Sequence, residues 1–264
     1  MPHAAGLHYE DYGPADAPPL LLSSGLGGGA GYWAPNLAAL SRRHRVILYD
    51  HRGTGRSERA VPGDLTLATL ADDIRGLLDA LDIARVTLIG HAIGGMAGLA
   101  LALAAPDRLA RLVVINGWAK LDPHTARCFD TRLALLRDSG ARAYLHAQPL
   151  FLFPAQWISD HHARLQDEEE VLLAQFPGAE MVQRRIAAAR RFDIADRLGE
   201  IAVPTLLVVS EDDMLVPPAC SERLAAGIRG AELARMATGG HACNVTRAEH
   251  FTLWLLDWLE NEKE

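Results

Sequence analysis

The chain has few cysteines, and their placement fits neither a covalent nor a metal framework. Three occur in 264 residues, Cys128, Cys220 and Cys243, and no two of them form a Cys-x-x-Cys pair. An odd number at wide spacing does not predict a disulfide scaffold or a zinc site. We therefore expect free thiols and no bound metal.

Positive charge and long apolar runs are also scarce. Lys and Arg number 26 against 33 Asp and Glu, a net charge of −7, which argues against nucleic acid or an anionic membrane as partner. Two arginine pairs, at 184–185 and 190–191, have acidic neighbours, and we interpret them as solvated helix faces. The longest apolar stretch, 96–105, is too short to span a bilayer. Because residues 1–12 also lack signal-peptide features, we expect a cytoplasmic protein.

Hydrophobic residues, by contrast, make up 49% of the chain, enough for a sizeable core. Several of these residues form continuous aliphatic and β-branched runs, and such runs predict strands that are buried on both faces. Between them lie helix-length stretches such as 67–81, whose leucines and isoleucine recur at three and four residues. This alternation predicts an α/β fold, a mostly parallel sheet with helices on both faces. The predicted strands are 20–23, 46–49, 86–89, 112–115 and 205–209.

The alternation of strand and helix lapses between residues 120 and 197. That segment holds helical patterns, for example 128–137 and 181–191, and no strand-like run. It predicts an all-helical cap, residues 120–197, inserted into a core made of residues 1–119 and 198–264. Ligands of open α/β sheets bind at the carboxyl ends of the strands, so we expect the cap to cover the site.

Residues 90–94, Gly-His-Ala-Ile-Gly, follow one buried strand directly and open a helix. This is the spacing of the G-x-S-x-G nucleophile elbow, which holds a reactive side chain above the sheet. The third position is Ala92, which has no lone pair, and no other G-x-S-x-G, G-x-C-x-G or G-x-D-x-G occurs. The sequence therefore predicts an elbow without a nucleophile.

An acid and a histidine follow downstream in the order that the elbow's usual partners take. Asp213 ends a buried strand, and His241 follows two glycines after the strand-like residues 231–236. Their order is typical of the α/β-hydrolase fold. We predict that Asp213 orients His241, and that Glu211 and Asp212 are surface or capping residues.

A backbone anion site is predicted beside the elbow. The Leu26 amide in a glycine-rich loop and the Ile93 amide at the helix start can face one point above Ala92, and such paired donors stabilise negative charge. That the glycines only permit a tight turn stays an open alternative. Residues 50–57 are interpreted as a scaffold turn that ties down Arg52.

Together these motifs and those of the cap resemble the RutD family of the Rut pathway for pyrimidine (uracil) degradation, nearly end to end. The elbow with alanine and the cap motifs are the most particular to this family, whereas the other core motifs belong to the wider superfamily. The matching segments are 24–28, 50–55, 90–94, 116–118, 124–125 with 127–129, 147–152 and 239–246.

The resemblance implies a hydrolase that cleaves a C–N bond in a small anionic acid without a metal or organic cofactor. Members are described as carbamate hydrolases and were earlier described as aminoacrylate hydrolases. Carbamate breaks into ammonia and carbon dioxide once its nitrogen is protonated, and aminoacrylate gives malonic semialdehyde and ammonia through an iminium. Neither reaction needs a covalent intermediate, so His241 could serve as the acid–base group, with Asp213 favouring its charged form.

Further candidates and rivals stay open at this point. Arg127 and Arg132, on the first helix of the cap, are candidates for binding the substrate anion. Trp118 either walls the site or packs in the core, and His91 is interpreted as structural. One rival is a binding protein that has lost catalysis, and another is an esterase that uses Cys243 or Thr246. The sequence does not settle which substrate is used or whether two copies form a homodimer.

Overall fold

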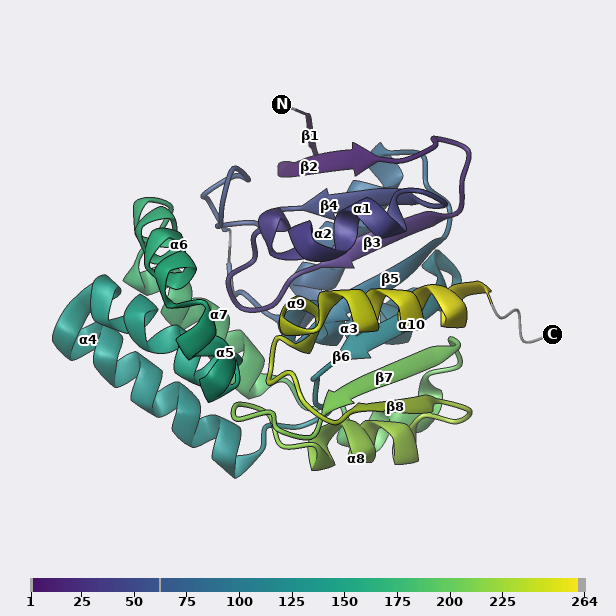
Figure 1. Cartoon of the computed structure of the whole chain (residues 1–264). Coiled ribbons are helices and arrows are strands. Elements are labelled where there is room, and N and C mark those ends of the chain that lie inside the picture. The colour runs from purple at the N-terminus through teal and green to yellow at the C-terminus, as the bar shows by residue number, and fades with distance from the viewer. Residues whose placement is uncertain (1, 62, 261–264) are drawn as a thin grey trace.

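The computed structural model describes residues 2–61 and 63–260, and its centre is a single eight-stranded sheet (Figure 1). The order across the sheet is β1-β2-β4-β3-β5-β6-β7-β8, and β3 to β8 run parallel. The strands are β1 (His3–Ala4), β2 (Leu7–Tyr12), β3 (Pro19–Ser23), β4 (Arg45–Tyr49), β5 (Val86–His91), β6 (Leu109–Ile115), β7 (Thr205–Ser210) and β8 (Glu232–Met236).

The predicted mostly parallel sheet is confirmed, with an antiparallel edge that the sequence did not reveal. β2 pairs antiparallel with β4, and β1 pairs antiparallel with β2. β2 was missed because only its first two residues are buried, so its sequence carries no continuous apolar run.

Helices cover both faces of the sheet, as predicted. The core helices are α1 (Ala34–Leu40), α2 (Leu67–Ala80), α3 (Ile93–Ala104), α8 (Ala219–Gly227), α9 (Cys243–Thr246) and α10 (Ala248–Glu260). Short 3-10 turns occur at η1 (Ala30–Trp33), η2 (Pro106–Arg108) and η3 (Ala195–Glu200).

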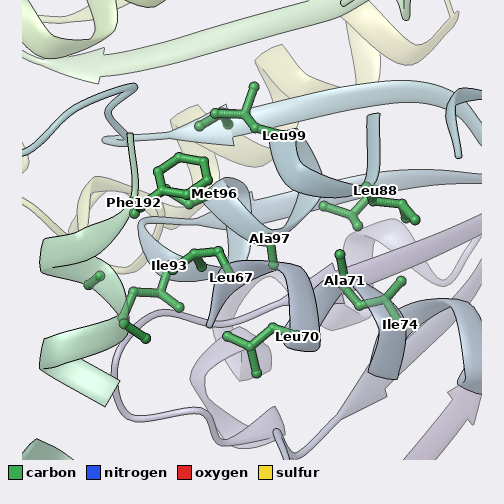
Figure 2. Close-up of a cluster of buried hydrophobic side chains, with 14 of the residues drawn as sticks. Leu67, Leu70, Ala71, Ile74, Leu88, Ile93, Met96, Ala97, Leu99 and Phe192 are labelled. Carbon is green, nitrogen blue, oxygen red and sulfur yellow. The ribbon is translucent and has the colours of Figure 1, made fainter. Parts of the chain in front are cut away.

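The apolar runs supply two cores, one on each face, because successive side chains of a strand point to opposite sides. Leu21 packs into the core beneath α2, α3 and α8, whereas Leu20 and Leu22 pack into the core beneath α1, α9 and α10. In the first core, Leu70 of α2 lies near Ala97 of α3 (Figure 2). This two-sided packing fixes the carboxyl ends of the strands, where the site is built.

In the sequence, all helices of the insertion come between β6 and β7. In space they lie to one side of the sheet, at the carboxyl ends of the strands (Figure 1). At its end, Phe192 lies beside Met96 of α3 in the first core (Figure 2). At its base, Lys120 forms a β-bridge with Asp193 and an ion pair of 2.9 Å. The helices are α4 (Pro123–Leu152), α5 (Ala155–Asp160), α6 (His162–Ala174) and α7 (Ala179–Arg191).

These helices fall within the predicted limits 120–197, and the division of the chain into core and cap stays a prediction. Within α4, Gly140 has a φ of 81°, which breaks the helix into two segments. Along residues 2–61 and 63–260, no helix has both the length and the apolar character needed to cross a membrane.

Candidate active site

The turn between β5 and α3 has the backbone of a nucleophile elbow. Ala92 sits at φ 47° and ψ −113°, a conformation that costs a non-glycine residue about 1–3 kcal/mol. Its amide donates to the Ile115 carbonyl at 2.8 Å, and its own carbonyl accepts from the Met96 amide at 2.9 Å. The fold therefore holds position 92 in a strained turn, and the side chain held there is a methyl group.

The elbow glycines are required by close packing. A Cβ atom on Gly90 would overlap the backbone of Gly95, and one on Gly94 would overlap the Ser23 carbonyl. No side chain fits at either position, because helix α3 starts directly against the ends of β3 and β5. The sharp strand–turn–helix unit predicted for residues 90–94 is confirmed.

His241 and Asp213 lie together beside the elbow. His241 Nδ1 is 2.8 Å from Asp213 Oδ2, and the other carboxylate oxygen accepts from the Leu215 and Val216 amides at 2.8 and 2.9 Å. Both side chains are almost fully buried. Because the carboxylate accepts from Nδ1–H, the second ring nitrogen, Nε2, is left for a substrate, and it has no hydrogen-bond partner in the described part of the chain.

The loop that carries His241 is held by three side chains. Asn116 Nδ2 donates to the His241 carbonyl at 2.7 Å, and His91 Nε2 lies 2.9 Å from the same oxygen. Asp212 accepts from the Gly240 amide at 2.8 Å and from the Ser210 hydroxyl at 2.7 Å. Burial alone would raise the pKa of Asp212, but these hydrogen bonds outweigh it and hold the pKa below its usual value. Asp212 therefore helps to position the His241 loop. The sequence predicted only a surface or capping residue and did not indicate this role.

His91 joins the elbow to this loop. Its ring centroid lies 4.7 Å from that of His241 in an edge-on contact, and Tyr32 stacks on it at 4.9 Å. Burial, with the neighbouring His241, lowers the pKa of His91 well below its usual value, so the ring is neutral. These contacts agree with the structural interpretation of His91 and place the His241 ring beside the residue that precedes Ala92.

The two amides of the predicted anion site lie at the ends of β3 and β5. Ile93 opens α3, and Leu26 follows β3 by three residues. Among the loop and turn hydrogen bonds of the described residues, none is donated by either amide. Their convergence on a substrate anion stays a prediction.

Arg185 corrects the sequence analysis: its side chain is 2% exposed and not part of a solvated helix face. Nε donates to the Leu26 carbonyl at 2.7 Å, and Nη2 donates to the Gly25 carbonyl at 3.2 Å and to His51 Nδ1 at 2.8 Å. Burial lowers the pKa of Arg185 to about 10, which leaves it protonated at neutral pH. Its Nη1 atom is buried with no partner.

A signal for Arg185 was present in the sequence. The buried residues of α7 include Met181, Val182, Ile186 and Ala189, and Arg185 falls on the stripe that they form. The interpretation of the sequence gave more weight to the charge of the Arg184–Arg185 pair than to this periodicity. Arg184 itself is half-buried, and it donates to the Val61 carbonyl.

The other arginine candidates differ in burial. Arg132 is 2% exposed and donates to the Tyr144 hydroxyl at 2.8 Å, and its Nε atom has no partner. Arg127 is exposed on the surface of α4. Trp118 is buried against Phe129 at 6.2 Å between ring centroids, with its indole nitrogen unpartnered. Trp118 thus packs in the core and also offers a free donor.

Arg52 is bound locally, as the sequence predicted for the turn at 50–57. It donates to Asp73 at 2.9 Å, to Glu58 at 2.7 Å and to the Ala5 carbonyl at 2.6 Å. The neighbouring His51 is the residue of this turn that reaches the site, through Arg185.

The two groups considered as alternative nucleophiles, Cys243 and Thr246, follow His241 on the same segment, and each has a structural role. Cys243 is fully buried, and burial together with Asp213 raises the pKa of its thiol to about 12. Thr246 Oγ1 donates to the Gly239 carbonyl at 2.6 Å. Neither group lies on the elbow, and a thiol with so high a pKa is protonated at neutral pH and a poor nucleophile.

We expect the native protein to leave its thiols unmodified by Ellman's reagent at pH 8. All three cysteines are buried, and burial raises the pKa of Cys220 to about 11. In guanidinium chloride the same sample should release three equivalents, which serves as the control. Fast, stoichiometric labelling of Cys243 in the folded protein would contradict its assignment as a packing residue.

Comparison with known proteins places this geometry in a family. Residues 18–248 match the family model described as alpha/beta hydrolase fold. The "Putative carbamate hydrolase RutD" of Caulobacter vibrioides is 52% identical over 257 residues, covering 97% of this chain and 96% of that protein. The chain belongs to the RutD family. The protein of the same name from Variovorax paradoxus is 51% identical over 254 residues, covering 96% of each chain.

Solved structures show the same fold beyond the RutD family. The enol-lactonase from Burkholderia xenovorans LB400 superposes with a TM-score of 0.86 at 32% identity, covering 97% of this chain and 96% of that one. A thermophilic esterase from Thermogutta terrifontis gives a TM-score of 0.83 at 27% identity, over 96% and 92% of the two chains. The protein is therefore a RutD homologue with the α/β-hydrolase fold.

Proposed function

We propose that this RutD homologue cleaves the C–N bond of carbamate by acid–base catalysis, without a covalent nucleophile. One observation carries the proposal: the His241–Asp213 pair is formed and buried beside an elbow whose side chain is the methyl of Ala92. Acyl transfer through a serine needs an oxygen nucleophile at this position. Proton transfer to a substrate nitrogen needs only the imidazole.

In the proposed reaction, protonated His241 gives its Nε2 proton to the nitrogen of carbamate. The product of this step, H₃N⁺–COO⁻, breaks its C–N bond, the bonding pair stays on nitrogen, and ammonia and carbon dioxide leave. The imidazole then regains a proton from water. Because the step turns a zwitterion into two neutral molecules, a buried site favours it over bulk water. General acid–base help of this kind is worth roughly 10²–10⁴-fold.

Aminoacrylate is the second candidate, and the buried arginines favour it. Here His241 would protonate the carbon next to the carboxylate, and water would add to the resulting iminium before ammonia leaves. The carboxylate survives this reaction, so a fixed cation such as Arg185 can bind it in substrate, intermediate and product alike. In carbamate the carboxylate becomes neutral carbon dioxide, so a cation would assist binding more than bond cleavage.

A small anionic substrate in the cytoplasm is part of the same proposal. The net charge of −7 gives no reason to expect a nucleic-acid partner, and the buried side chains of Arg132 and Arg185 support an anionic substrate. The three free thiols agree with a reducing compartment. A homodimer is not needed for any contact described above.

The decisive experiment compares both substrates with their uncatalysed breakdown. Stopped-flow mixing of carbamate with a pH indicator measures proton uptake, and the ultraviolet absorbance of the enamine follows aminoacrylate. We expect the purified protein to accelerate carbamate loss in proportion to its concentration. Equal rates with and without protein for both substrates would leave the binding-protein alternative standing and overturn the proposal.

A further inference from the structure

The cap buries two guanidinium groups that have no acidic partner. Arg132 and Arg185 are each 2% exposed, and neither forms an ion pair with any residue in the described ranges. Another arginine of the cap, Arg190, does have an acidic partner: it forms an ion pair with Asp130 at 2.6 Å near the surface. Burying a charge without a counter-ion is costly by several kcal/mol. Two such charges in the cap indicate that a bound anion serves as their counter-ion.

Arg185 contacts the loop that follows β3, where it donates to the Leu26 and Gly25 carbonyls. Arg132 donates through Nη2 to the Tyr144 hydroxyl at 2.8 Å and lies 5.7 Å from the centroid of the Phe151 ring. The residue after Phe151, Leu152, accepts through its carbonyl from the Ala242 amide at 3.0 Å, so the segment next to Arg132 is hydrogen-bonded to the loop that carries His241.

Three buried donors in this region have no acceptor. They are the Nε of Arg132, the Nη1 of Arg185 and the indole Nε1 of Trp118. Trp118 contacts Phe129, which lies one helical turn before Arg132. These nitrogens donate only, so a group that satisfies any of them must bring an acceptor atom. A carboxylate supplies two oxygens and the missing negative charge.

We propose that Arg185, assisted by Arg132, binds the carboxylate oxygens of the substrate, an inference that rests on the proposed function. Arg185 holds the Gly25 and Leu26 carbonyls through Nη2 and Nε, which leaves Nη1 for the anion. The same side chain therefore fixes the loop that carries the Leu26 amide. The anion is recognised chiefly by these side chains of the cap, and the Leu26 and Ile93 amides are secondary.

Kinetics give the first test. In Arg185→Gln the KM for carbamate should rise about 10- to 100-fold, the usual effect of losing a buried charge-assisted hydrogen bond. The kcat should not fall, because the cation binds the carbamate carboxylate in the ground state and this contact weakens as the carboxylate becomes neutral carbon dioxide. Arg185→Lys, which keeps the charge, should give an intermediate KM. Arg190→Gln, which removes a cation from the same helix but outside the site, should leave both constants unchanged.

Binding of sodium acetate gives a second test that needs no turnover. Acetate should raise the Tm of the wild type by about 2–4 °C at a concentration tenfold above its Kd. Sodium chloride at equal ionic strength and acetamide, the uncharged analogue, should not raise it. Arg185→Gln should lose the acetate shift, and Arg190→Gln should keep it. If Arg185→Gln does not fold, Arg132→Gln is judged by the same two criteria.

The outcomes separate this inference from the proposed function. Acetate binding that depends on Arg185, in a protein without C–N hydrolase activity, would support the anion site and reject the proposed reaction. A folded Arg185→Gln that keeps both the wild-type KM and the acetate shift would overturn the inference while the proposed reaction stands.

Discussion

Replacing His241 with alanine is expected to lower kcat for C–N cleavage by about 10²–10⁴-fold, which is the range of general acid–base catalysis. His241 Nε2 is the nitrogen that the Asp213 contact leaves for the substrate. KM should change little, because the anion is held by other groups. The measurement is steady-state kinetics by stopped-flow, with circular dichroism as the check on folding.

Asp213→Asn is the companion variant, and we expect a smaller loss of activity. One oxygen of Asp213 accepts two amide protons, from Leu215 and Val216, and the other accepts from His241. An asparagine satisfies those amides only if its NH₂ group faces His241, which forces the wrong tautomer on the ring and removes the charge that favours imidazolium. A His241→Ala variant that is folded and fully active would reject the acid–base assignment, whatever Asp213→Asn does.

The pairing of Asp213 with His241 could be predicted because its signals are local. Asp213 follows the buried strand β7 by three residues, and His241 follows a pair of glycines, so both positions can be predicted from a few neighbouring residues. The elbow was predictable for the same reason, since the close packing at Gly90 and Gly94 admits no side chain there. The positions of Asp213, His241 and the elbow can therefore all be predicted from the local spacing of residues.

Arg132 was a candidate from the sequence, but the burial of Arg185 was harder to predict, because contacts of this kind join residues far apart in the chain. Arg185 reaches the Leu26 carbonyl across 159 positions, and Asn116 reaches the His241 carbonyl across 125. Nothing in the sequence around residue 185 indicates which loop the cap will meet. The spacing of apolar residues predicted that one face of α7 is buried. A pair of charged residues normally indicates solvent exposure, but this rule was wrong for Arg185.

Ala92→Ser is expected to create esterase activity that the wild type lacks. The hydroxyl would enter a turn already in the elbow conformation, at φ 47°, with the His241–Asp213 pair beside it. One added oxygen is a small change at a position whose strained backbone is already fixed by hydrogen bonds to Ile115 and Met96, so the fold should survive. The wild type should show only background hydrolysis of a chromogenic acetate ester.

The size of this gain depends on how closely the histidine meets the new serine. An error of about 1 Å in the position of a reacting group can cost on the order of 10²-fold, so the new activity can be well below that of a natural esterase. The control is the double variant Ala92→Ser with His241→Ala. Hydrolysis that appears in the single variant and disappears in the double one shows that His241 activates the serine hydroxyl. If both folded variants hydrolyse the ester at the background rate, the His241–Asp213 pair does not converge on the elbow. Because C–N cleavage is proposed to need no nucleophile, Ala92→Ser should keep much of its carbamate activity, whereas His241→Ala should lose both reactions.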